Sequence, residues 1–172
     1  CALPIFQAAS RVLAVRGQVL PATLDALTLV AELEDGTQAR GESAISASGP
    51  PIRRIWCEPH DPAALPEVVR AIREADAIIL GPGSLYTSII PNLLIPEILS
   101  EILRSTAPRI YICNVMTQPG ETDGYSVADH VRALQRLGGR NLFDWVLVNE
   151  EIPHVLLESY DAKGQDRKSI RL

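Results

Sequence analysis

The sequence predicts an α/β fold with a mostly parallel sheet and a β-hairpin excursion. Two observations lead to this prediction. Short apolar runs of strand length alternate with stretches of helical periodicity between residues 51 and 149, and this order implies right-handed crossovers that connect parallel strands. Polar loops also follow three of the apolar runs, as is typical of α/β sheets that bind ligands at the carboxyl ends of their strands.

The first half of the chain is predicted to form mainly strands. Residues 12–15 and 18–20 are short β-like runs, and "LTLVAELEDGTQARGES" at 27–43 reads as a hairpin. Its turn is Glu34-Asp35-Gly36, because Asp-Gly between alternating segments favours a tight reversal. Residues 51–59, "PIRRIWCEP", form another strand in which apolar residues alternate with arginines. Arg53 and Arg54 are therefore expected on opposite faces.

The second half predicts helices between strands. A helix at about 65–74 begins near Asp61 or Pro66, and "DAIIL" at 76–80 reads as a strand buried on both sides. The next helix resumes only after Pro96, at 97–104, and is followed by a strand at 109–115. A helix at 127–137, capped by Ser126 and Asp129, leads to a last strand at 145–149.

Composition excludes several classes of function. The net charge of −5 over 172 residues lacks the basic footprint that a nucleic acid requires. The longest apolar run, 89–103, is interrupted by proline, asparagine and glutamate, so we expect no membrane insertion. The three cysteines show no CxxC spacing, so we expect no metal site or disulfide framework and a cytoplasmic location, with Cys57 and Cys113 as small buried hydrophobes.

The loop after the 76–80 strand is the first candidate site. Gly81 and Gly83 let backbone N–H groups turn toward an anion, and three hydroxyl side chains follow them, those of Ser84, Thr87 and Ser88. A plain strand-to-helix turn is the alternative, because Gly-Pro-Gly is turn chemistry wherever it occurs. We expect this loop to contact ligand phosphates.

The loop after the 109–115 strand concentrates polar groups within ten positions: Asn114, Thr117, Gln118, Glu121, Thr122 and Asp123. Loop carboxylates at such a place can bind a divalent cation or accept hydrogen bonds from ribose hydroxyls. For Asp123, capping of the following helix is an equal alternative. A third polar stretch, "NEEIPH" at 149–154, is expected to converge on the same crevice.

Other conspicuous residues have ordinary explanations. His130 has no second histidine or cysteine at ligand spacing, so a helix-face or cap-supporting role is expected. His60 and His154 are expected at the surface. Trp56 and Trp145 follow the apolar pattern and are expected as core or interface anchors.

Five stretches carry a resemblance: "VLAVRGQVLPAT", "ELEDGTQARGES", "ADAIILGPGSLYTSIIPNLLIPEI", "YICNVMTQPGETDGYSVADHVRAL" and "LESYDAKG". Together they resemble the bacterial gluconeogenesis factor family, within the wider group typified by 2-phospho-L-lactate transferase. The resemblance implies a Rossmann-like three-layer domain at 7–165, incomplete in this fragment, because the family's Gly-Gly-Gly-Thr-Gly loop and Asp-Asp-Gly-Gly-Ser-Ser-Gly stretch are missing. Glu97 stands where members often have glycine.

Both termini look foreign to this domain. Cys1–Ile5 and Asp166–Ser169 are what a common sequencing adapter and its reverse complement encode. Residues 1–6 and 166–172 are therefore expected to be non-native.

The resemblance implies two alternative functions. The first is a binder of a UDP-sugar, similar to UDP-N-acetylglucosamine, that links carbon metabolism to cell-wall growth and cell shape. The second is a transferase that moves a phospholactyl group from a nucleotide donor to a deazaflavin alcohol, with Mg²⁺ as its cofactor. The loop 81–86, Gly-Pro-Gly-Ser-Leu-Tyr, resembles the first branch. Homo-oligomerisation stays open.

The expected ligand-binding residues are Gly81, Pro82, Gly83, Ser84, Tyr86, Thr87, Ser88, Asn114, Thr117, Gln118, Glu121, Thr122, Asp123 and Tyr160. The ring of Tyr160 is expected either to stack on the base or to pack the chain end onto the sheet.

Overall fold

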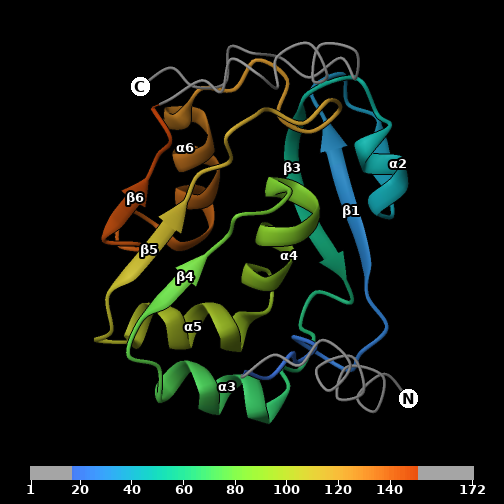
Figure 1. Ribbon diagram of the computed structural model, residues 1–172. Coiled ribbons are helices and arrows are strands. Elements are labelled where there is room, and N and C mark those ends of the chain that lie inside the picture. Colours follow the sequence, from blue (N-terminus) through green and yellow to red (C-terminus); the bar gives the residue numbers. More distant parts are fainter. Residues whose placement is uncertain (1–16, 151–172) are drawn as a thin grey trace.

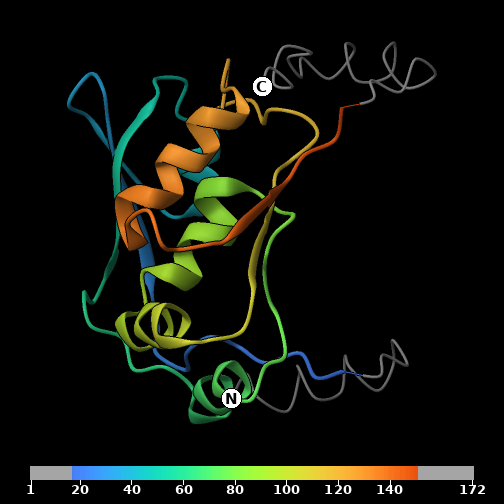
Figure 2. The same ribbon diagram turned by 90° about the vertical axis from the view of Figure 1, so that its left-hand side faces the viewer.

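Two three-stranded sheets enclose a layer of helices in the computed structural model, which describes residues 17–150. Figure 1 shows the elements in order, and Figure 2 shows the helices α4 and α6 between the two sheets. The mixed α/β fold and its parallel sheet confirm the predicted fold class.

The first sheet is antiparallel, with the strand order β2-β1-β3. It contains β1 (Thr28–Leu33), β2 (Gln38–Arg40) and β3 (Ile52–Glu58). The predicted hairpin is confirmed: Gly36 has a φ of 84° in the turn, and Asp35 Oδ1 accepts a hydrogen bond from the Thr37 N–H at 2.9 Å. Because β3 pairs with β1, the excursion is a complete three-stranded sheet.

Three expectations for this half are not confirmed by the described residues. Residues 18–20 form no strand, and 12–15 lie outside the described residues. A short helix, α2 (Glu42–Ser46), follows β2 where the sequence predicted only the end of the hairpin. It begins after Gly41, whose φ of 84° turns the chain, and it buries Ile45 in the core.

The second sheet is parallel, with the order β4-β5-β6. Its strands are β4 (Ile78–Leu80), β5 (Arg109–Ile112) and β6 (Trp145–Leu147). Ile79 pairs with Ile110, and Tyr111 pairs with Val146, so the three carboxyl ends lie at one edge. This is the arrangement that the alternation of strands and helices predicted.

The predicted helices are present as α3 (Pro66–Arg73), α5 (Pro96–Arg104) and α6 (Val127–Gly138). Ser126 and Asp129 form the predicted capping box at the start of α6. However, the helical path resumes long before Pro96. A wide turn, η1 (Leu85–Ile89), in which the Ile89 N–H reaches the Ser84 carbonyl at 2.9 Å, continues into α4 (Ile90–Leu93). Pro91 fits there because it stands in the first turn of α4, where its missing N–H is not needed.

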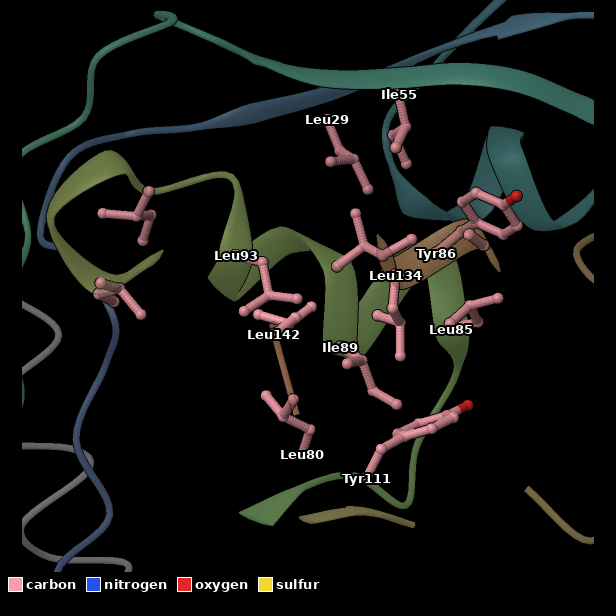
Figure 3. Packing of buried hydrophobic residues seen from close by; sticks show 14 of the residues in the cluster. Leu29, Ile55, Leu80, Leu85, Tyr86, Ile89, Leu93, Tyr111, Leu134 and Leu142 are labelled. Carbon is pink, nitrogen blue, oxygen red and sulfur yellow. The ribbon is translucent and has the colours of Figure 1, made fainter. Parts of the chain in front are cut away.

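The core lies between the sheets. In Figure 3, Leu29 and Ile55 approach from the antiparallel sheet and Leu80 and Tyr111 from the parallel sheet, with helical residues between them. Cys57 and Cys113 are buried and free, as predicted, and burial raises the pKa of both thiols. Within residues 17–150, no helix combines the length and apolar character needed to cross a membrane.

One face of the parallel sheet remains exposed. Ile79, Trp145 and Leu147 are 58%, 68% and 59% exposed. The expectation that the 76–80 strand is buried on both sides is therefore wrong for Ile79, and a core role for Trp145 is wrong as well. Both side chains belong to strands whose other face alone packs on the helices of the described chain (Figure 2).

Candidate functional site

The first predicted loop, 81–88, leaves the carboxyl end of β4 and bends at once. Gly81 has a φ of +82°, and a Cβ there would lie 2.9 Å from the Ile112 carbonyl oxygen on β5. Gly81 is therefore required by the neighbouring strand. Gly83 differs, because a Cβ there would find only ordinary contacts, 3.5 Å from Ser88 Cβ and 3.7 Å from Ile89 Cγ1. The fold itself leaves room for a methyl group at Gly83.

Asn114 joins the first loop to the second. Its Oδ1 accepts a hydrogen bond from the Gly83 N–H at 3.2 Å, and its Nδ2 donates to the Gly83 carbonyl at 2.8 Å. A side-chain amide is the group that can satisfy a backbone donor and a backbone acceptor together. Asn114 and Gly83, both predicted site residues, are thus brought together at the carboxyl ends of β4 and β5.

Glu121 forms the centre of a buried hydrogen-bond network and is only 2% exposed. Its Oε1 accepts from Ser46 Oγ at 2.8 Å, Thr87 Oγ1 at 2.7 Å and Gln118 Nε2 at 2.9 Å. Its Oε2 accepts from the Tyr86 N–H at 3.2 Å. This carboxylate therefore fastens the first loop, the second loop and α2 to one another, and its oxygens are engaged by protein donors.

The remaining residues of the second loop stabilise its backbone. Thr117 and Thr122 are buried, and Thr122 Oγ1 accepts from the Gln118 N–H at 2.8 Å. Asp123 is exposed, and its Oδ2 accepts from the Gly120 N–H at 2.6 Å. Asp123 therefore caps a turn of its own loop, whereas Asp129 caps α6.

The hydroxyls of Ser84 and Ser88 have no hydrogen-bond partner among the described residues, whereas the hydroxyl of Thr87 is engaged by Glu121. Ser84 is half-buried and Ser88 is exposed. Pro82 is exposed beside them. Gly83 therefore lies beside two hydroxyls, those of Ser84 and Ser88, that no described residue engages.

Three residues of this region were not predicted. Ser46 and Gly120 meet where α2 packs on the second loop, and a Cβ at Gly120 would overlap the Ser46 carbonyl oxygen. Tyr125 Oη lies 2.9 Å from Tyr86 Oη. Gly120 and Tyr125 lie within the "PGETDGY" stretch at 119–125, whereas no motif marked Ser46, because its contacts join segments far apart in the sequence.

Some predicted residues lie beyond the description. Of the third polar stretch only Asn149 and Glu150 belong to the described residues, and Tyr160 lies outside them. The stacking role of Tyr160 and the convergence of the third loop therefore stay predictions.

The carboxylates of the second loop do not provide a set of ligands that fits a magnesium ion by itself. Glu121 is engaged by four donors, and Asp123 has one oxygen engaged by Gly120. Among residues 17–150, no three histidine, cysteine or acidic side chains gather as a group that could hold a metal ion.

The fold and the two linked loops define an α/β domain with a polar rim at the carboxyl ends of parallel strands, the position where ligands of such sheets bind. Comparison with known families finds a match over nearly the whole chain. Residues 3–171 match the model of the family described as 2-phospho-L-lactate transferase CofD, and the chain belongs to this family.

Its relatives are gluconeogenesis factors. The chain is 52% identical over 156 residues to the gluconeogenesis factor of Bacillus subtilis, covering 90% of this chain and 49% of that protein. A Nostoc sp. protein that provisionally carries the same name is 60% identical over 147 residues, covering 85% of this chain and 32% of that protein. The chain thus spans about a third of the length of one of these relatives and about half of the other.

A solved structure supports the fold. A crystal structure of a UPF0052 family member from Bacillus halodurans superposes with a TM-score of 0.88 at 45% identity. The match covers 95% of this chain and 54% of that chain.

Proposed function

We propose that the chain is part of a gluconeogenesis factor that binds a UDP-sugar similar to UDP-N-acetylglucosamine and links carbon metabolism to cell-wall growth and cell shape. The binding proposal depends on the surroundings of Gly83. Its backbone is held by Asn114, its neighbours Ser84 and Ser88 keep their hydroxyls free of partners in the described chain, and its own Cα has space for a methyl group. The Gly83 N–H is engaged by Asn114 and does not turn toward an anion as expected, so the phosphate would be bound by the hydroxyls of Ser84 and Ser88 while it passes close to the Gly83 Cα.

The substitution Gly83→Ala tests this proposal in the full chain. The added methyl finds only ordinary contacts, so we expect native circular dichroism and an unchanged melting temperature. The methyl would displace a bound phosphate from the loop. Losing one hydrogen bond between the charged phosphate and the Ser84 or Ser88 hydroxyl weakens binding by about tenfold or more. Isothermal titration calorimetry with UDP-N-acetylglucosamine measures the change, and Gly83→Val should abolish binding.

Gly17→Ala is the matched control, because a Cβ at Gly17 has nothing within 4 Å. Unchanged affinity in Gly83→Ala and Gly83→Val would remove the 81–88 loop from the site.

The description of the matching family favours a second candidate, transfer of a phospholactyl group from a nucleotide donor to a deazaflavin alcohol. In that case Mg²⁺ would be the expected cofactor, and residues outside the described range would have to supply most of its ligands. Parallel titrations with GTP, GDP and UDP-N-acetylglucosamine distinguish the two candidates. Tight binding of guanine nucleotides together with phospholactyl transfer would contradict the UDP-sugar proposal.

A further inference from the structure

A cavity of about 410 Å³ lies between β3 and the helices α4 and α6. Its apolar walls include Ile55 from β3, Ile90 from α4 with Leu94 directly after it, and Ala133 and Leu137 from α6. This volume falls in the range of small-molecule sites, which are mostly apolar with a few polar groups. Tyr86 is the one residue of the two predicted loops among its lining.

Among the described residues, the charged side chains that line this cavity are all arginines. Arg53, Arg54 and Arg136 line it together with His60, and no aspartate or glutamate of residues 17–150 does. This single sign is unexpected in a chain with 21 acidic and 16 basic residues. We call this space the arginine cavity.

Two of the arginines lack a carboxylate partner within the described chain. Arg53 pairs with Glu32 at 3.1 Å, but Arg54 and Arg136 belong to none of the ion pairs found there. Arg54 instead lies over the ring of Trp56, with 5.5 Å from its Cζ to the ring centroid. Stacking of this kind holds the guanidinium in place while its N–H groups stay available for a carboxylate or phosphate.

A β-bulge explains why neighbouring arginines share the cavity. Glu32 pairs with Arg54, whereas Leu33 pairs with Ile52, so Arg53 is the extra residue of β3. The expectation that Arg53 and Arg54 lie on opposite faces is therefore wrong, because the bulge interrupts the alternation. Bulges of this kind redirect side chains beside functional sites.

We propose that the arginine cavity binds a small organic anion, whose apolar body fills the space between β3, α4 and α6 and whose carboxylate or phosphate reaches Arg54 and Arg136. This site shares only Tyr86 with the two predicted loops and takes the rest of its lining from other segments. The ligand class follows from the chemistry of the lining, since an apolar wall accepts an acyl or aromatic group and unpaired guanidinium groups accept planar or tetrahedral anions.

Trp56 provides a local signal for the test. The sequence contains two tryptophans, and Trp145 is largely exposed on another face, so Trp145→Phe leaves Trp56 as the sole indole. In this background the full chain, labelled with ¹⁵N, is titrated with 4-phenylbutyrate, with phenyl phosphate and with the uncharged 4-phenylbutanol. We expect saturable shifts of the Trp56 indole N–H signal, with at least one of the two anions binding about tenfold more tightly than the alcohol, the scale of one charge-assisted hydrogen bond.

The variants Arg54→Gln and Arg136→Gln should each reduce the affinity for the anions toward that for the alcohol, while the alcohol itself binds as before. Arg140→Gln is the matched control, because Arg140 is exposed just beyond α6 and does not line the cavity. Ala133→Leu should fill the cavity and remove binding of all three probes.

Three results would overturn the proposal. The first is equal affinity for anions and alcohol, and the second is anion binding that survives in the double arginine variant. The third is displacement of 4-phenylbutyrate by UDP-N-acetylglucosamine, which would make the cavity part of the nucleotide site.

Discussion

Glu121 illustrates, at the scale of a single residue, how a polar side chain in a ligand-binding type of loop can serve the protein itself. Four donors from α2 and both loops converge on its carboxylate. Removing the charge leaves buried donors poorly satisfied, so Glu121→Gln should lower the free energy of unfolding by about 1–3 kcal/mol. Urea denaturation measures this change.

Asp123→Asn is the control for that substitution, because Asp123 is exposed in the same loop and an asparagine oxygen can still accept the hydrogen bond from the Gly120 N–H. We expect it to stay within about 0.5 kcal/mol of the parent chain. A Glu121→Gln protein of unchanged stability that loses UDP-sugar binding would instead make Glu121 a ligand residue.

His130 should make stability depend on pH. It is 1% exposed, its Nδ1–H donates to the Ser126 carbonyl at 2.9 Å, and its Nε2 is buried without a partner among the described residues. Burial lowers the pKa of His130, and the Ser126 carbonyl and Asp129 offset this only in part. The unfolded chain then binds the proton more tightly than the folded chain, so stability falls as the pH drops through about 6.5, the ordinary histidine value.

Chemical denaturation at pH 7.5, 6.5 and 5.5 measures this slope. His130→Leu should flatten it, whereas His60→Gln, at an exposed position, should leave it unchanged. Asp129 and the other carboxylates with a lowered pKa lose their contribution at lower pH, below this window. An equal slope in the His130→Leu protein would contradict the assignment.

At the scale of elements, the start of α6 is determined by hydrogen bonds between residues that are close in the sequence. Ser126 Oγ accepts from the Asp129 N–H at 3.2 Å, and Asp129 Oδ2 accepts from the Ser126 N–H at 2.9 Å. Ser126→Ala should therefore lower the free energy of unfolding by about 0.5–2 kcal/mol, the usual effect of losing such a cap. Thermal unfolding followed by circular dichroism checks it, with Ser43→Ala in the exposed first turn of α2 as the control. Equal melting temperatures for the two variants would refute a stabilising cap.

The elements that the sequence could predict are those with such local signals. The hairpin turn at Asp35 and Gly36, the first-turn prolines of α3 and α5, and the capping box of α6 act within a few residues. The helix α2 and the turn η1 lack a side-chain cap, and they are held by long-range contacts instead. The Ser46 hydroxyl donates to Glu121, 75 positions away in the sequence, and no local sequence pattern predicts this contact.

The same distinction applies to the candidate site. Parallel strand order was enough to predict that Gly83 and Asn114 meet at one edge. Which polar groups stay free could not be predicted, because that depends on partners from α2 and from the opposite loop. The arginine cavity was also beyond prediction, since the bulge at Arg53 breaks the alternation on which the interpretation of that strand rested.

At the scale of the whole molecule, the described chain covers only one face of its parallel sheet. Ile79, Trp145 and Leu147 lie on the other face and are more than half exposed. Large apolar side chains side by side on a sheet favour association with other proteins or with further copies. Both sheet edges in the described residues, β4 and β6, are also unpaired, which adds to this tendency.

We therefore expect the full chain to self-associate as its concentration rises, in a manner that sedimentation velocity detects. Burying one large apolar side chain contributes about 1.5–3 kcal/mol, so Trp145→Lys or Leu147→Lys should weaken association by about tenfold or more. Neither change should alter the melting temperature of the monomer, because both side chains are already exposed. Leu24→Lys is the matched control, since Leu24 is 56% exposed but lies outside both sheets. A parent chain that stays monomeric at all concentrations would show that this face does not drive association, whereas an equal effect of Leu24→Lys would show that added positive charge, and not the sheet face, controls it.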